Sequence, residues 1–146
     1  MYHYTECGLK NIWLSNGYTE RKTAHGAAVA IADMVGLHRA IGLHLVTHKP
    51  QLTGAEVRYL RIELDLSQDA LARIIGVNET SVRGWENHRT KITKPAERLL
   101  RLLYKESVSG DGNVRALIDS IAQLNRDIHS EKINLSHDSH GWNEAA

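Results

Sequence analysis

Two short helical patterns separated by a glycine constrain, more than any other feature, how this chain of 146 residues folds. Ser67 has the side chain of a helix N-cap, and the residues 68–75 that follow carry apolar side chains at helical spacing. Gly76 comes next, and glycine adopts at low cost the left-handed conformation that ends a helix. Asn78 has the side chain of a second N-cap, and its helix is expected to run to Asn87. The sequence therefore predicts two helices joined by a tight turn.

Further helices are predicted on both sides of this pair. Thr53 and Glu56 have the spacing of a capping box, so an amphipathic helix is expected to start there and to end near Asp65. Pro95 marks the start of a helix after the pair. The apolar face of that helix comprises Ala96, Leu99, Leu100, Leu102 and Leu103. Together these patterns predict a small helical bundle.

The first third of the chain predicts a small antiparallel β-sheet. Asn16 and Gly17 tolerate positive φ, so a hairpin is expected to join a strand over residues 11–14 to a return strand over residues 18–22. Short β-favouring runs at residues 2–6 and 27–32 can complete the sheet.

Two more amphipathic helices are expected outside the bundle. Asp33 begins one over Met34–His48, which Pro50 stops. After a Ser- and Gly-rich break, apolar residues at helical spacing predict the other over Val114–Ile128. Its apolar face requires a partner, either the bundle or its own copy in a dimer. Residues 130–146 are expected to form a polar tail, with an added strand of the N-terminal sheet as the alternative.

The distribution of charge divides the chain into three regions, which correspond to the N-terminal strands and helix, the helical bundle and the C-terminal helix with its tail. Residues 1–52 have a net charge of +2 and are interpreted as a small β-sheet and helix for scaffolding, dimerisation or partner binding. Residues 53–105 carry ten basic against seven acidic side chains and are interpreted as a DNA-binding domain. Residues 106–146, an amphipathic helix and tail, carry three basic against seven acidic side chains. The middle region has the charge best suited to a polyanion, and the last region repels one.

A resemblance to a known family is carried by the paired helices. The middle region resembles, in order and spacing, the helix-turn-helix of the lambda-repressor-like or Xre family, through Leu66-Ser67-Gln68, Leu71-Ala72, Gly76-Val77, Ser81-Val82 and Trp85-Glu86. The resemblance implies a helix-turn-helix bundle, here in an α+β, mainly α chain, and a transcriptional regulator that binds double-stranded DNA.

The resemblance assigns DNA contacts to the second helix of the pair. Glu79, Thr80, Arg83 and Gly84 lie on its side opposite Val82 and Trp85. Arginine pairs bidentately with guanine and threonine presents a hydroxyl and a methyl group, so Thr80 and Arg83 are the leading base or phosphate contacts. The expected DNA-binding residues are Gln68, Asn78, Glu79, Thr80, Ser81, Arg83, Arg89, Lys91 and Lys94.

The loop after this helix departs from the family pattern. His88 stands where glycine is frequent, so it must take a costly backbone angle or reshape the loop. Arg89, Lys91 and Lys94 are expected to contact phosphates, and a solvated basic loop is the alternative.

Two further roles are structural. In similar repressors an arginine of the first helix and a glutamate at the end of the third form an ion pair, which implies a structural ion pair between Arg61 and Glu86 here. Trp85 shares the apolar side of its helix with Val82 and is expected in the core.

Composition argues against several other classes of protein. No apolar run is long enough to span a membrane and no signal segment is found, so a cytoplasmic protein without membrane contact is expected. A single cysteine, Cys7, forms neither an internal disulfide nor a paired-cysteine zinc site. No motif predicts catalysis, and the histidine pairs 44/48 and 137/140 lack further ligands at metal-binding spacing, so no cofactor or metal is expected.

The whole chain has a weaker resemblance to MqsA-type antitoxins but lacks their zinc-binding cysteines. The favoured interpretation is a sequence-specific repressor acting as a homodimer on a palindromic operator. The alternative is an antitoxin or protein-interaction module whose N-terminal region binds a partner such as a toxin. A metal or small-molecule sensor is a third possibility that the histidines permit without supporting it.

Overall fold

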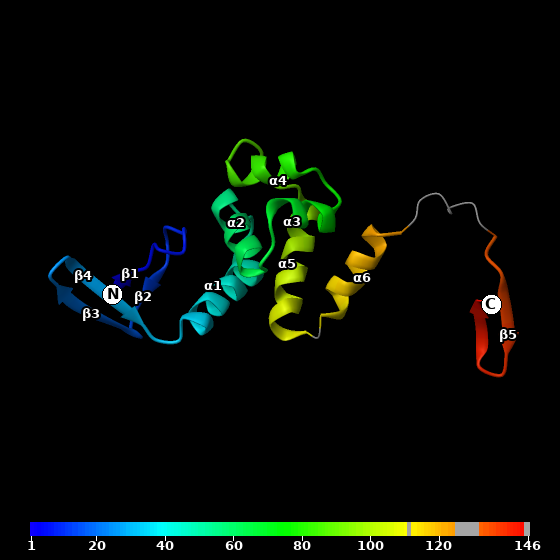
Figure 1. Cartoon of the computed structure of the whole chain (residues 1–146), viewed down its shortest axis with the longest axis horizontal. Coiled ribbons are helices and arrows are strands. Elements are labelled where there is room, and N and C mark those ends of the chain that lie inside the picture. The colour runs from blue at the N-terminus through cyan, green and yellow to red at the C-terminus, as the bar shows by residue number, and fades with distance from the viewer. Residues whose placement is uncertain (111, 125–131, 145–146) are drawn as a thin grey trace.

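The computed structural model describes residues 1–110, 112–124 and 132–144, and a bundle of helices forms its centre (Figure 1). The helices in these residues are α1 (Met34–His48), α2 (Gly54–Glu63), α3 (Gln68–Ile75), α4 (Glu79–Glu86), α5 (Lys94–Ser109) and α6 (Asn113–Ala122). The strands are β1 (Tyr2–His3), β2 (Trp13–Leu14), β3 (Tyr18–Thr23), β4 (Gly26–Ile31), β5 (Leu135–Asp138) and β6 (Gly141–Glu144). The predicted α+β class, mainly α, is confirmed.

Local capping explains where several helices begin and end. The Thr53 hydroxyl accepts a hydrogen bond from Glu56 N, and the Glu56 carboxylate accepts one from Thr53 N, which completes the predicted capping box of α2. Ser67 caps α3, and Gly76 ends it at φ 89°. Asn78 precedes α4 as predicted, but its side chain forms no capping hydrogen bond. α4 also ends one residue earlier than expected, at Glu86.

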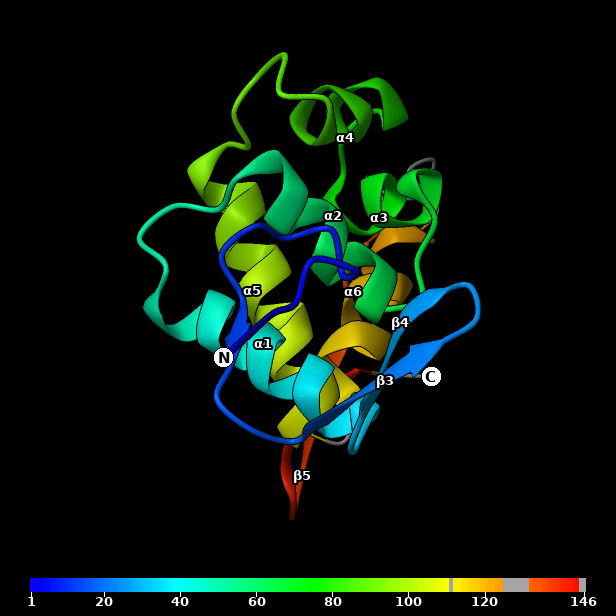
Figure 2. The same ribbon diagram turned by 90° about the vertical axis from the view of Figure 1, so that its left-hand side faces the viewer.

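The core lies between α2, α3, α4 and α5. Its largest fully buried side chains are Val57, Leu60, Leu71, Val82 and Leu100. Trp85 is also buried, as its spacing from Val82 predicted. Viewed end on, α4 lies at one end of the bundle, with α1 and α5 beneath it (Figure 2). One face of α4 is therefore fixed in the core while the opposite face is open to a partner.

α1 is fastened to the bundle through α5. The Arg101 guanidinium donates hydrogen bonds to the carbonyl oxygens of Leu45, Val46 and Lys49 at the C-terminal end of α1. Arg101 also pairs with Glu97 at 2.6 Å, and the second Glu97 oxygen accepts a hydrogen bond from Leu52 N. These contacts satisfy carbonyl groups that a helix end leaves free. α1 thus packs with the helical bundle, while a domain boundary at residue 52 stays a prediction.

The N-terminal strands pair differently from the prediction. β1 pairs with β2, and β3 pairs with β4 through the two-residue loop Ala24-His25, so the expected hairpin at Asn16-Gly17 is wrong. Gly17 does adopt positive φ, but its carbonyl oxygen accepts a hydrogen bond from Ala32 N beyond the end of β4. The six-residue ladder between β3 and β4 provides more backbone hydrogen bonds than the short β2 can offer. Separate ribbons, not one sheet, therefore precede α1.

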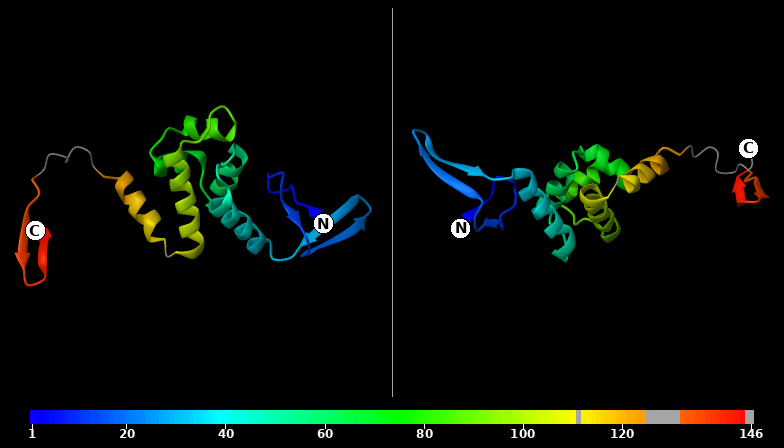
Figure 3. Two further views of the ribbon diagram at one scale, coloured as in Figure 1. Left: turned by 180° about the vertical axis from the view of Figure 1, so that it is seen from behind. Right: turned by 90° about the horizontal axis from the view of Figure 1, so that it is seen from below.

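The C-terminal region also differs from the prediction. α6 ends at Ala122, so the expected helix to Ile128 is wrong at Gln123 and Leu124, which are described and not helical, while residues 125–128 lie outside the described residues. Over residues 132–144 the expected polar tail is wrong, because β5 and β6 form a hairpin. β5 pairs only with β6 among the described strands, so the alternative of an added strand in the N-terminal sheet is also wrong. Positive φ at Gly141 and an Asp138 side chain that accepts from His140 N close the turn. This hairpin lies apart from the helices (Figure 3).

Candidate nucleic-acid interface

The turn between α3 and α4 sets the angle at which α4 is presented. The carbonyl oxygen of Ala72 accepts hydrogen bonds from Gly76 N at 2.8 Å and from Val77 N at 3.0 Å. Together with positive φ at Gly76, these bonds reverse the chain over two residues, and half-buried Val77 packs against the core. The N-terminal half of α4 therefore projects from the bundle, as a helix that enters the major groove requires.

The outer face of α4 carries the residues predicted to contact DNA. Glu79, Thr80 and Arg83 are exposed, Asn78 before them is exposed, and Ser81 is half-buried toward the turn. Gly84 was expected on this face but is buried, and its carbonyl oxygen accepts a hydrogen bond from Arg89 N at 2.9 Å. The exposed face is consequently shorter than the sequence pattern indicated, and it ends at Arg83.

Arg83 has a partner in the free protein. Its Nη2 lies 3.1 Å from Glu79 Oε1, one helical turn away, and both side chains are more than two-fifths exposed. Exposed pairs of this kind contribute about 0.5 kcal/mol or less to stability. Arg83 is thus held along the helix by a bond weak enough for a base or phosphate to displace.

The predicted ion pair between Arg61 and Glu86 is present and fixes both ends of the helix pair. Arg61 Nε donates to Glu86 Oε2 at 2.7 Å and Nη2 donates to Oε1 at 2.9 Å, which is a bidentate arrangement. Arg61 Nη1 also donates to the carbonyl oxygen of Leu66, just before α3. The Glu86 side chain is only 3% exposed. α2, α4 and the start of α3 are therefore joined through one guanidinium group.

Gln68 belongs to the same network, which the sequence did not reveal. Its side-chain amide donates to Glu86 Oε1 at 3.2 Å, so one of its two N–H groups is directed into the protein. The carboxamide oxygen and the second N–H stay available to a phosphate, and the predicted DNA contact of Gln68 stays a prediction. Eighteen residues separate Gln68 and Glu86, so only tertiary packing brings them together.

The loop after α4 and the first residue of α5 carry three exposed cations. His88 adopts φ 61°, the costly backbone angle that its position predicted. Buried Ile92 anchors the loop, while Arg89, Lys91 and Lys94 are exposed. In the part of the chain that the structure describes, none of these three forms an ion pair. Their charges are therefore free to attract an anionic partner.

A close backbone contact that sequence analysis missed supports this loop. A Cβ atom on Gly54, at the start of α2, would lie 2.2 Å from the carbonyl oxygen of Trp85 and about 3.1 Å from the His88 ring. Glycine is therefore required where the N-terminus of α2 meets the C-terminal end of α4. Its place directly after the helix cap Thr53 gave no signal for this contact.

The histidine pairs do not assemble a metal site within the described residues. The rings of His44 and His48 lie 5.0 Å apart, but no group of three or more His, Cys, Asp or Glu side chains gathers around a common point in those residues. His137 lies in β5 and His140 lies in the turn before β6. Among the helices described, none is long and apolar enough to cross a membrane.

Comparison with known proteins identifies the region that holds these features. Residues 57–102, from within α2 to the middle of α5, match the family model described as helix-turn-helix. These residues form a helix-turn-helix domain of the Xre, lambda-repressor-like type, and the class of protein that such a domain defines is the DNA-binding regulator. Neither the curated proteins nor the solved structures compared with the chain gave a match.

Proposed function

We propose that the protein is a sequence-specific repressor that binds a palindromic operator as a homodimer and blocks access to a promoter, acting by binding and not by catalysis. The observation that carries this proposal is the exposed face of α4, which presents Thr80 and Arg83 beside three cations, in the following loop and at the start of α5, that form no ion pair within the described residues. Thr80 and Arg83 contact base edges, while Arg89, Lys91 and Lys94 contact phosphates on the flanking backbone.

The N-terminus of α3 provides a second backbone contact in this proposal. A helix leaves its first amide groups without intrahelical partners, and Ser67 caps one of them by accepting from Ala70 N. The helix dipole and these amides attract a phosphate, and Gln68 adds its remaining donor. In this proposal, α3 and the loop after α4 contact the DNA backbone on both sides of the groove that α4 enters.

An uncovered apolar face on α6 supports the homodimer. Ile118 packs against the core, but Leu117 and Ile121, one helical turn apart on another side of α6, are 61% and 56% exposed, and Leu124 just beyond the helix is 65% exposed. One helix-turn-helix reads only a half-site, so two copies joined by a two-fold axis match a palindrome. The sequence left dimerisation open between residues 1–52 and the helix expected over Val114–Ile128, and this face favours α6.

The proposal is tested by selecting random duplex DNA on the purified protein at about 0.15 M salt, where most non-specific electrostatic binding is suppressed. A recovered palindrome is the expected result. A recovered single half-site contradicts the dimer, and no enriched sequence contradicts sequence-specific repression.

The α6 interface is tested by sedimentation of Leu117→Glu/Ile121→Glu, with Ser120→Glu on the same exposed helix as the matched control. The double variant is expected to sediment as a 16.4 kDa monomer. The control is expected to stay dimeric. If both variants behave alike, α6 is not the interface.

One observation favours the second candidate, a protein-interaction module or antitoxin. Trp13 in β2 is 56% exposed, stacks on the His3 ring at 4.0 Å, and borders a cavity of about 300 Å³ between β2 and α1. Large exposed aromatic side chains are typical anchors in protein interfaces. Co-expression with the product of a neighbouring gene tests this candidate, because Trp13→Ala is expected to abolish a complex that Trp142→Ala leaves intact.

A further inference from the structure

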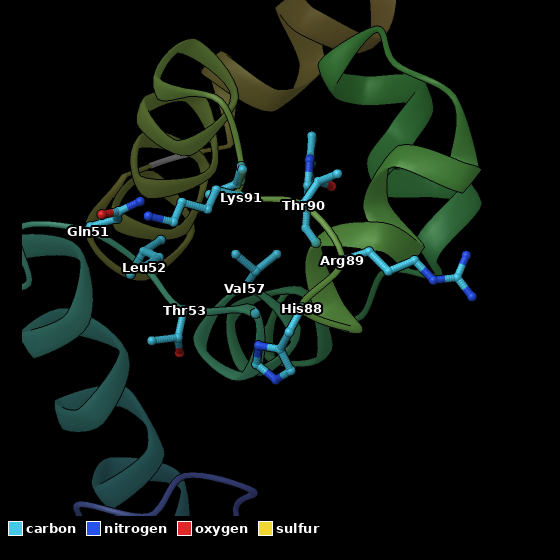
Figure 4. A pocket seen from close by; sticks show the side chains of 11 residues that line it. Gln51, Leu52, Thr53, Val57, His88, Arg89, Thr90 and Lys91 are labelled. Carbon is cyan, nitrogen blue, oxygen red and sulfur yellow. The ribbon is translucent and has the colours of Figure 1, made fainter.

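A cavity of about 440 Å³ lies between the start of α2 and the loop that follows α4 (Figure 4). One wall comes from Gln51, Leu52 and Thr53, and the other from the segment 88–92. A volume of this size is typical of small-molecule sites in proteins. The cavity thus borders the same loop that carries the proposed phosphate contacts.

The floor of the cavity is apolar. Val57, Trp85, Leu52 and Ile92 contribute to its lining, and each of these residues is 6% exposed or less. The main chain at Gly54 lies among them, without a side chain to fill the space. A phosphodiester brings no apolar group to such a floor. A ligand with an apolar body of a few rings or branches covers this floor and removes its apolar surface from water.

Two cationic side chains, Arg89 and Lys91, line the rim of the cavity. His88, Arg89 and Lys91 contribute to the lining, and none of the lining side chains, all within the described residues, is acidic. The neighbouring carboxylate of Glu56 is already engaged, 3.3 Å from Lys49 Nζ and bonded to Thr53 N. Lys91 extends across the mouth toward Gln51, whereas Arg89 points away from the cavity (Figure 4). Lys91 is therefore the cation placed to meet an anionic group at the mouth.

We propose that this cavity binds a small organic anion with an apolar body, and that its occupation withdraws Lys91 from the DNA backbone. The apolar body lies on the floor formed by Val57, Trp85 and Ile92, and the carboxylate pairs with Lys91 at the rim. The proposed effect on DNA binding rests on the proposed contact between Lys91 and a DNA phosphate, because one ammonium group cannot pair fully with both the ligand and the phosphate. The binding half stands independently of DNA.

The loop after α4 also contains a residue with an unfavourable backbone conformation. His88 holds φ 61°, a conformation that costs about 1 kcal/mol or more for a residue other than glycine. Its ring packs near Gly54 at the edge of the cavity. A ligand beside this ring contacts the same loop that carries Lys91, the proposed phosphate contact. Binding of the anion and of DNA is then coupled reciprocally.

The first experiment measures binding without DNA. The probe is 2-naphthoate, and its uncharged counterpart 2-naphthamide is the control ligand, with the indole N–H resonance of Trp85 as the reporter. Saturable shifts of this resonance are expected with 2-naphthoate. The affinity for 2-naphthamide is expected to be at least about tenfold weaker, and Lys91→Gln is expected to weaken 2-naphthoate binding by a similar factor. Lys105→Gln, an exposed lysine on α5 outside the cavity, is expected to bind as the wild type does. No saturable shift, or equal affinity for both ligands, overturns the site.

The second experiment adds DNA. Saturating 2-naphthoate is expected to weaken DNA binding, and DNA is expected to weaken 2-naphthoate binding by the same factor. Unchanged DNA affinity with an occupied cavity overturns the proposed effect on DNA binding. Failure of the protein to bind any DNA contradicts the proposed function instead, and the first experiment still decides whether the cavity is a ligand site.

Discussion

The Arg83 guanidinium lies 3.1 Å from the Glu79 carboxylate on the outer face of α4, so the side chain best suited to read guanine is already paired in the free protein. Any DNA contact by Arg83 must displace this pair or include it. Glu79 also places a negative charge where phosphates approach, which penalises non-specific binding more than specific binding.

Glu79→Gln is expected to raise affinity for random duplex DNA by roughly threefold and to lower the ratio of specific to random binding, because it removes repulsion from all sequences. Titrations of operator and random duplexes at the same salt concentration measure both quantities. Glu20→Gln, which removes an exposed carboxylate from β3, outside α3, α4 and the loop after α4, is the matched control. Equal effects of the two changes mean that Glu79 acts only through net charge.

Arg83→Ala and Lys91→Ala are expected to affect DNA binding in different ways. Loss of Arg83 weakens operator binding by about 1 to 3 kcal/mol and relaxes selectivity at one base pair, because a base contact is lost. Loss of Lys91 weakens binding to all sequences alike and reduces the slope of log K against log salt by about one. Binding curves on operator and single-base variants at several salt concentrations separate the two. Equal effects of both changes on random DNA contradict the assignment.

Arg61→Ala is expected to lower the free energy of unfolding by about 3 kcal/mol, because it leaves the Glu86 carboxylate, only 3% exposed, without its cation. Urea unfolding measures the change. The double variant Arg61→Met/Glu86→Leu is expected to regain much of that loss, since no buried charge is left. A double variant less stable than Arg61→Ala would show that the pair contributes more than the burial of apolar side chains of similar size.

Gly54→Ala is expected to destabilise the domain by about 2 to 3 kcal/mol, because the new Cβ meets the Trp85 carbonyl oxygen, a backbone atom that does not rotate aside. Gly84→Ala is the matched control. Its Cβ lies 3.2 Å from the Thr90 hydroxyl, which moves readily, so a change of less than about 1 kcal/mol is expected. Thermal unfolding of both variants compares them, and similar losses contradict the close-contact argument.

Stability is expected to fall above about pH 10, the ordinary pKa of tyrosine. Burial raises the pKa of Tyr59, and it also raises those of Tyr4 and Tyr104. The unfolded chain therefore releases these protons first, so the stabilising contribution is complete below about pH 10 and is lost as pH rises. Tyr59→Phe is expected to reduce the slope of stability against pH between about 10 and 11. An unchanged slope contradicts a role for Tyr59.

Local signals in the sequence were sufficient for most helices. The bounds of α1 and α3 follow from Asp33, Ser67 and Gly76, because N-caps and a left-handed glycine act within one helical turn. The family resemblance left two outcomes open at His88, a costly backbone angle or a reshaped loop, and the structure has the costly angle. Strand pairing was not predictable in the same way. Two turns competed, and the longer ladder between β3 and β4 decided the outcome.

The sequence by itself determined the paired helices and most of their apolar and exposed faces, because each depends on neighbours within a few positions. Two positions were wrong: Gly84 of α4 is buried, and Leu102 of α5, expected on the apolar face, is 50% exposed. The Arg61–Glu86 pair came from the family resemblance. Tertiary structure alone decided that Gln68 joins this pair, that Gly54 meets the Trp85 carbonyl and that a cavity opens beside Lys91. These relationships join residues separated by 18 to 40 positions, and packing of the core, which no local pattern encodes, sets their distances.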